Sequence, residues 1–131
     1  MRHQNHEDHK SEACLKSIEA IKDTLYVLSG KWKLPIIVAL SSGPMRFKDL
    51  QRSLEDITPK ILSKELKELE LNEFVTRTVY ATSPVTVEYA LTTYSESLDN
   101  IIEEMREWGL QHRKRIMNNS RKNKKKELVE A

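Results

Sequence analysis

Basic and hydroxyl side chains recur between residues 46 and 67 of this 131-residue chain, at spacings that would place several of them on one surface. Lysine ammonium groups bind phosphates or guanine acceptors, and hydroxyls hydrogen-bond either kind of group. These residue types therefore favour non-covalent polar contacts with a polyanion over covalent chemistry. The candidate contact residues are Arg46, Lys48, Thr58, Pro59, Lys60, Ser63, Lys64 and Lys67.

Two short helices are expected to position these side chains. The first spans roughly Phe47 to Ser53. The second begins after Thr58, a good N-cap residue, with Pro59 in the favoured first helical position. Leucines at helical spacing predict the buried stripe of this second helix, which leaves its basic and hydroxyl residues outside. The stripe consists of Leu62, Leu66 and Leu69, with Ile61 at its edge.

A β-hairpin is expected directly after the helix pair, because residues 74–80 and 85–91 alternate apolar and polar and Ser83-Pro84 separates them. Helix, turn, helix and hairpin is the order of a winged helix, whose second helix enters the major groove of DNA. The hairpin would supply Arg77 and Thr82. The expected fold is mainly α with a small β-hairpin: a winged helix-turn-helix with terminal dimerisation helices.

The alternative is that this helix has no binding role, because the lysine-bearing face of an amphipathic helix is usually just exposed to solvent. A winged helix used for protein contacts, without sequence-specific DNA binding, is the alternative function. The candidate helix carries no arginine or asparagine, so DNA shape would supply part of any specificity.

Apolar stripes at both ends of the chain predict helices that pack against a partner helix. In the first helix the stripe runs through Cys14, and in the last helix the apolar residues step by three and four, a seam suited to a partner helix. Packing within one monomer is the alternative. The predicted dimer interface comprises Ile18, Leu25, Leu98, Ile101, Met105 and Trp108.

Charge is distributed unevenly behind a net value of +2. Between Arg113 and Lys126 there are eight basic residues and no acidic one, while the rest of the chain has 14 basic against 20 acidic residues. The basic segment 113–126 would bind phosphates, bind an acidic partner or increase solubility. We expect a disordered arm over residues 1–10, a winged-helix domain over 11–117 and a basic flexible tail over 118–131.

The composition and motifs of the chain argue against a membrane protein, an enzyme and a metal-binding protein. The longest apolar run, Leu34 to Leu40, is too short to span a membrane, and a single cysteine suits a reducing cytoplasm. No phosphate-binding loop or nucleophile elbow occurs, so we expect no enzyme and no cofactor. Histidines 3, 6 and 9 lie three residues apart and could bind a metal, but we interpret them as a polar tail and predict no metal site.

Four ordered blocks carry a resemblance to a known family. They are Gly30-Lys31-Trp32-Lys33-Leu34-Pro35-Ile36-Ile37, Gly43-Pro44-Met45-Arg46-Phe47-Lys48-Asp49-Leu50, Ile57-Thr58-Pro59-Lys60-Ile61-Leu62-Ser63 and Val87-Glu88-Tyr89-Ala90-Leu91-Thr92. Together with Trp108-Gly109 they closely resemble the HxlR family of MarR-like winged-helix regulators. The resemblance covers about residues 14–112. It implies a homodimer built from the terminal helices, with two recognition helices about one DNA turn (~34 Å) apart on double-stranded DNA.

Two positions depart from the family pattern, and one cysteine matches it. Family members usually have glycine where Glu73 and Ser95 stand; at the first site we expect Asn72 to take the left-handed conformation instead. Family members carry a cysteine near Cys14, and some sense oxidants or electrophiles with it. A helix N-terminus and nearby lysines would favour a reactive thiolate here. A small buried packing residue is the alternative.

Overall fold

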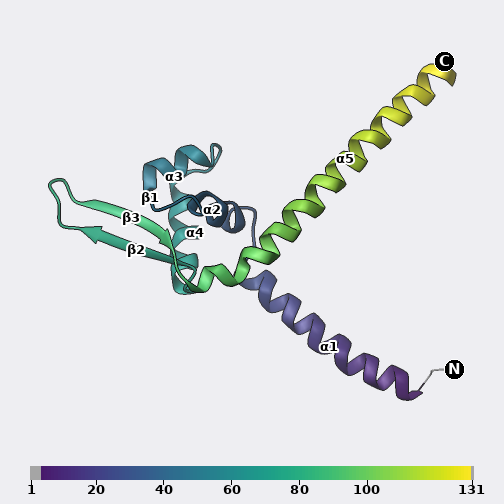
Figure 1. Ribbon diagram of the computed structural model, residues 1–131, viewed down its shortest axis with the longest axis horizontal. Helices are drawn as coiled ribbons and strands as arrows, with labels where there is room; N and C mark the ends of the chain where they lie inside the picture. Colours follow the sequence, from purple (N-terminus) through teal and green to yellow (C-terminus); the bar gives the residue numbers. More distant parts are fainter. Residues whose placement is uncertain (1–3, 131) are drawn as a thin grey trace. The chain divides into compact units, whose positions relative to one another are not determined.

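The computed structural model describes residues 4–130, except the side chains of 4–10 and 130, and divides the chain into two units. The first unit, up to Tyr94, carries most of the secondary structure, and the second is dominated by one long helix (Figure 1). This mainly helical fold with a small antiparallel sheet confirms the predicted fold class. The elements are α1 (Gln4–Val27), α2 (Lys33–Leu40), β1 (Met45–Arg46), α3 (Phe47–Ser53), α4 (Pro59–Leu71), β2 (Val75–Tyr80), β3 (Thr86–Leu91), a 3-10 turn (Tyr94–Leu98) and α5 (Asp99–Glu130).

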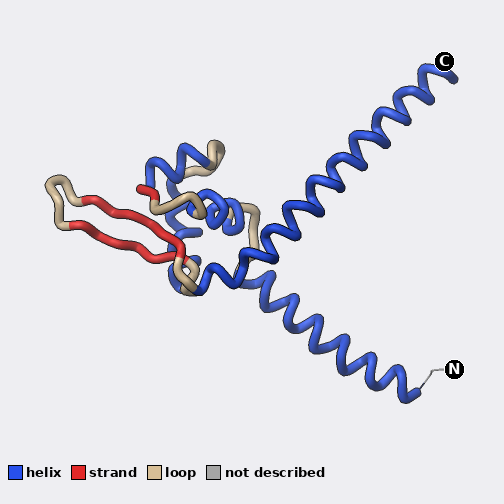
Figure 2. The backbone as a smooth tube through the Cα atoms, viewed as in Figure 1, coloured by secondary structure: helices blue, strands red, loops and turns tan. Residues whose placement is uncertain are grey.

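The sheet has three antiparallel strands in the order β1-β3-β2 (Figure 2). The predicted hairpin is β2 and β3, whose register runs from Val75 opposite Leu91 to Tyr80 opposite Thr86. The two-residue strand β1 was not predicted, and it pairs Arg46 with Glu88 on β3. Because β1 leads directly into α3, this pairing ties the first helix of the pair to the hairpin.

The core of the first unit lies where α2, α3 and α4 meet the base of the hairpin. Apolar residues from each element are at most 7% exposed there, as hydrophobic burial requires. The predicted leucine stripe of α4 belongs to this core, which confirms that part of the sequence analysis. The core residues of the unit are Leu28, Ile36, Ile37, Leu40, Leu50, Ile57, Leu62, Leu66, Leu69, Phe74 and Val75.

The end of α4 corrects one prediction. Asn72 has φ −90°, and it is Glu73 that takes the left-handed conformation, with φ 66°. The Asn72 amide group donates to the backbone oxygen of Glu68 (3.0 Å), so Asn72 serves as the C-cap. The N–H of Glu73 then bonds Glu70, and the N–H of Phe74 bonds Leu69, which is the Schellman pattern. The left-handed position therefore falls one residue later than predicted.

Both terminal helices extend further than the sequence predicts. In place of a disordered arm over residues 1–10, α1 begins at Gln4; residues 1–3 lie outside the described part of the chain. In place of a flexible tail from residue 118, α5 continues to Glu130. Neither segment contains glycine or proline, and lysine, arginine, glutamate and leucine are strong helix formers, so no local signal ends either helix.

Within residues 4–130, no helix combines the length and the apolar character that crossing a membrane requires.

Candidate nucleic-acid interface

The N-terminus of α4 has the capping geometry that the sequence predicted. Thr58 is extended (φ −81°, ψ 153°), and its Oγ1 accepts a hydrogen bond from the backbone N–H of Ile61 at 3.2 Å. Pro59 occupies the first helical position, where its missing N–H costs nothing. Since the cap uses an acceptor lone pair of Thr58, its hydroxyl offers chiefly the O–H donor to a ligand.

One face of α4 is buried and the other carries the predicted contact residues. Leu62 and Leu69 are fully buried, whereas every candidate on the opposite face is exposed. The exposed candidates follow the i, i+3, i+4, i+7 pattern of a single helical face. They are Lys60, Ser63, Lys64 and Lys67.

Arg77 joins this helical face rather than the tip of the hairpin. It lies near the start of β2, opposite Tyr89 on β3. A groove of about 390 Å³ is lined by Ser63, Lys67, Glu70, Arg77 and Tyr89, so Arg77 lies beside the exposed side of α4. Glu70 was not predicted at this site, although it continues the face one turn beyond Lys67. A carboxylate at this position repels phosphates and can accept a hydrogen bond from a cytosine amino group.

Thr82, the other hairpin candidate, lies in the loop between β2 and β3 and is exposed. Its Oγ1 donates to the backbone oxygen of Pro84 at 2.7 Å and lies 2.9 Å from Oγ1 of Thr86. The hydroxyl is therefore engaged within its own loop. Thr82 follows Arg77 by five positions, and β2 ends between them at Tyr80. Five steps of extended chain span roughly 16 Å, so the hairpin does not bring these two candidates together.

Arg46 and Lys48 lie at the start of the helix pair, and both are exposed. Arg46 ends β1 and precedes α3, while Lys48 lies in the first turn of α3. A second groove of about 350 Å³ is lined by Lys48, Gln51, Arg52 and Glu55. Arg52 is a basic neighbour that was not among the predicted contact residues, although its spacing of four from Lys48 places both on one helical face.

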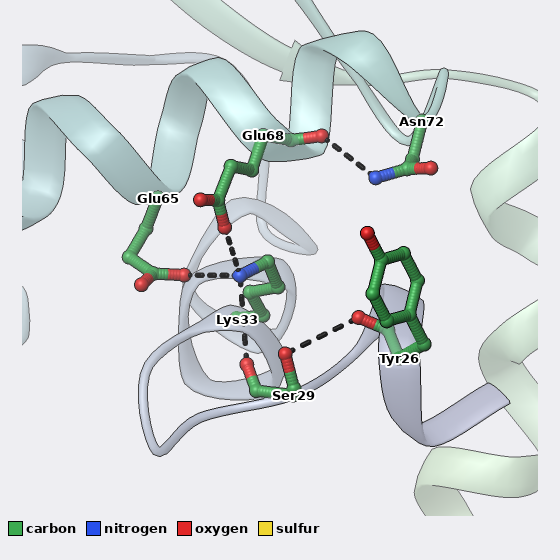
Figure 3. Close-up of polar contacts among 6 residues, drawn as sticks. All are labelled: Tyr26, Ser29, Lys33, Glu65, Glu68 and Asn72. Carbon is green, nitrogen blue, oxygen red and sulfur yellow. Dashed lines mark hydrogen bonds and ion pairs between the residues drawn. The ribbon is translucent and has the colours of Figure 1, made fainter. Parts of the chain in front are cut away.

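The buried side of α4 is held by ion pairs that were also missed. Lys33 is only 4% exposed, and its Nζ lies 2.7 Å from Oε2 of Glu65 and 2.5 Å from Oε2 of Glu68 (Figure 3). The sequence did contain a signal, since Lys33 shares helical spacing with the buried residues Ile36, Ile37 and Leu40. A lysine on an apolar helix face needs a partner if it is to be buried.

Opposing effects act on the titration of this cluster. Desolvation by burial alone would lower the pKa of Lys33, but the hydrogen bonds and charges of Glu65 and Glu68 outweigh it and raise that pKa. The hydrogen bond from Lys33 lowers the pKa of Glu68, with a further contribution from the charge of Lys64. Lys33 and Glu68 therefore both stay charged across the neutral pH range.

Cys14 is exposed, but it does not lie at a helix N-terminus. Because α1 begins at Gln4, Cys14 lies in its third turn, and the dipole effect of a helix end fades within the first turn. The helix-terminus argument for a reactive thiolate is therefore wrong. The alternative of a buried packing residue is not what the structure shows either.

Most of the predicted dimer residues expose apolar side chains. On α1, Ile18 and Leu25 are 47% and 62% exposed. On α5, Ile101, Met105 and Trp108 are exposed, and the Trp108 ring stacks on His112 at 4.7 Å. Leu98 differs, because it is only 6% exposed within the chain itself and so adds little to an external seam.

Among the side chains that the structure describes, no three His, Cys, Asp or Glu residues lie close enough together to hold a metal ion. The predicted polar tail with histidines 3, 6 and 9 has its side chains outside that description.

Comparison with known proteins identifies the family. Residues 27–117 match the family described as HxlR-like helix-turn-helix. The HTH-type transcriptional regulator YtcD of Bacillus subtilis (strain 168) is 38% identical over 97 residues, 74% of this chain and 77% of that protein. The redox regulator HypR, in its reduced form, is 37% identical with a TM-score of 0.69, covering 72% of this chain and 93% of that one.

A further solved structure is similar to a comparable extent. The reduced form of the transcriptional regulator YodB from B. subtilis is 37% identical with a TM-score of 0.64, covering 70% of this chain and 90% of that one. Proteins of this kind regulate transcription and are not enzymes. The chain belongs to the HxlR-like helix-turn-helix family and is a DNA-binding transcriptional regulator.

Proposed function

We propose that this regulator acts in the cytoplasm as a homodimer that binds a near-palindromic operator, with α4 of each subunit in the major groove. The exposed face of α4 is the observation that carries the proposal, because it combines three lysines and a serine at helical spacing above a leucine core. Arg77 extends that face across the groove to β2. Arg46, Lys48, Thr58, Pro59 and Thr82 complete the proposed contact set.

Exposed apolar residues support the homodimer. A soluble monomer rarely leaves rows of isoleucine, leucine, methionine and tryptophan open to water along two helices. The seams on α1 and α5 repeat at steps of three and four, which suits pairing between helices. A dimer would place two copies of α4 on two half-sites about one DNA turn (~34 Å) apart, and each copy would need only a few base-reading side chains.

Selection from random duplex DNA tests the operator proposal. Purified protein should enrich duplexes with two related half-sites in inverted orientation, centred about 10 base pairs apart. Enrichment of a single unrepeated site would reject the near-palindromic operator. Recovery of no sequence above the starting pool would reject sequence-specific reading altogether.

Cys14 is the proposed point at which an oxidant or electrophile tunes DNA binding. Its thiol is exposed on the single chain, on the α1 stripe that would face the partner subunit, and similarity to the redox regulator HypR supports this role. The chain has one cysteine, so a disulfide must join two subunits or one subunit and a small thiol. In the first case two thiols lose two protons and two electrons to diamide, which is reduced to its hydrazine as the sulfur–sulfur bond forms.

A Cys14→Ser variant is expected to bind the selected operator like wild type and to lose its response to diamide. Serine keeps the size of the side chain but removes the only thiol, and position 14 lies outside the proposed DNA face. Titration of operator with and without diamide, read by fluorescence anisotropy, measures both properties. A variant whose operator affinity still changes with diamide would show that Cys14 is not the sensor.

A further inference from the structure

One buried lysine joins three segments of the first unit. Lys33 begins α2, and its ammonium group reaches Glu65 and Glu68 on α4 (Figure 3). The same Nζ also donates to the backbone oxygen of Ser29 at 3.5 Å, in the connection that follows α1. The Ser29 hydroxyl in turn donates to the backbone oxygen of Tyr26 at the end of α1, at 3.2 Å.

The contacts continue along α4 to its C-terminal end. Glu68, which accepts from Lys33 through its side chain, also accepts the capping hydrogen bond of Asn72 through its backbone oxygen. Glu65 and Glu68 lie one turn apart and point toward the same ammonium group. The last helical turns of α4 are therefore fixed by charge to the first residue of α2, in addition to the leucine packing, and the same ammonium group makes one long hydrogen bond to the connection that follows α1.

We propose that Lys33 is a positioning residue for DNA reading, which sets how α4 is seated against the connection between α1 and α2. This rests on the proposed use of α4 as the recognition helix. Apolar contact has no preferred direction of its own, whereas a buried ammonium group with two carboxylate partners fixes direction as well as distance. A displacement at the end of α1 would reach α4 through the same group.

Two variants distinguish the effect of Lys33 on the stability of the protein from its effect on the position of α4. Lys33→Met leaves Glu65, whose side chain is only 12% exposed, without its cation, so Tm should fall by about 10 °C. Lys33→Met with Glu65→Leu replaces the ion pair by apolar contact, which is often neutral for stability. Its Tm should return to within about 3 °C of wild type.

Operator specificity is the deciding measurement. In the double variant Lys33→Met/Glu65→Leu we expect operator affinity to stay about tenfold below wild type. Its affinity for unrelated duplex should stay within about twofold of the wild-type value. Recovery of Tm together with wild-type operator affinity would reduce Lys33 to a stability role and overturn the proposal.

Glu68→Ala provides a second test on a residue that is tolerant of change, since the Glu68 side chain is 40% exposed. We expect it to fold and to bind operator about threefold more weakly than wild type, with little change for unrelated duplex. An unchanged ratio of the two affinities would overturn the proposal even if the double variant failed to fold.

The operator affinity of the Lys60→Ala/Lys64→Ala variant distinguishes an error in the role of Lys33 from an error in the role of α4. If Lys60→Ala/Lys64→Ala binds operator like wild type, α4 is not the reading element, and the proposed function fails with the positioning role. If that variant loses operator binding while the Lys33 and Glu68 variants keep wild-type specificity, only the positioning role of Lys33 fails.

Discussion

Replacing Lys60 and Lys64 together by alanine is expected to weaken operator binding about a hundredfold while the protein stays folded and dimeric. Both side chains are exposed on the outer face of α4, so no packing is lost. A dimer loses four ammonium groups, and each phosphate contact contributes about 0.9 to the slope of log affinity against log salt concentration. Titrations at several salt concentrations should show that slope reduced by up to about four.

A charge-matched control separates contact from general attraction. Lys16→Ala/Lys22→Ala removes the same charge from exposed positions on α1, outside the proposed DNA face. It should change operator affinity by no more than about threefold. If the α4 variant binds as well as this control, the assignment of α4 as the recognition helix is wrong.

Ile101→Asp together with Met105→Asp is expected to convert the dimer into monomers of 15.3 kDa. Both residues are exposed on the apolar seam of α5, and pairing of two seams would bury four unpaired carboxylates at a cost of several kcal/mol. Operator affinity should fall by about a hundredfold or more, because each half-site loses the effective concentration supplied by its partner. Sedimentation at micromolar protein concentration measures the mass.

The control for this variant adds the same charge to the same helix away from the seam. Lys114→Asp changes the charge by the same two units at an exposed position that lies at least 120° around α5 from every seam residue, by the 100° that each helical residue turns. This protein should remain a dimer. A wild-type protein that already sediments as a 15.3 kDa monomer would reject the dimer, and so would seam variants that stay dimeric.

Features set by neighbouring residues were predictable from the sequence. The start of α4 depends on Thr58 and Pro59, which are adjacent, and its buried face depends on leucines within a few turns. The range of α3 was predicted correctly as Phe47 to Ser53 for the same reason. The exposed face of α4 then follows, because the leucines that face the core leave the lysines outside.

Features set by distant residues were missed. Strand β1 exists because Met45 and Arg46 pair with β3, more than 40 residues away, and two residues carry no strand signal of their own. The partners of Lys33 are likewise more than 30 residues distant. Arg77 was predicted on the hairpin but not beside α4, because sequence spacing alone does not show which strand residues face that helix.

Helix ends were the least predictable local feature. The ends of α1 and α5 were placed too far inward because charge and histidine content indicated disorder, although no residue there breaks a helix. The same error led to the helix-terminus argument for Cys14. At the end of α4, Asn72 uses its side chain in the cap, and the left-handed conformation falls on Glu73 despite its steric cost.

Cleavage of operator DNA from a reagent attached to α4 tests the central claim most directly. Ser63→Cys in the Cys14→Ser background offers one thiol, on the exposed face of α4, for attachment of an iron chelate. We predict strand cleavage in two clusters about 10 base pairs apart, one for each recognition helix of a dimer. Operator that is bound but left uncut from position 63, or cut in a single cluster, would contradict a homodimer reading DNA through α4.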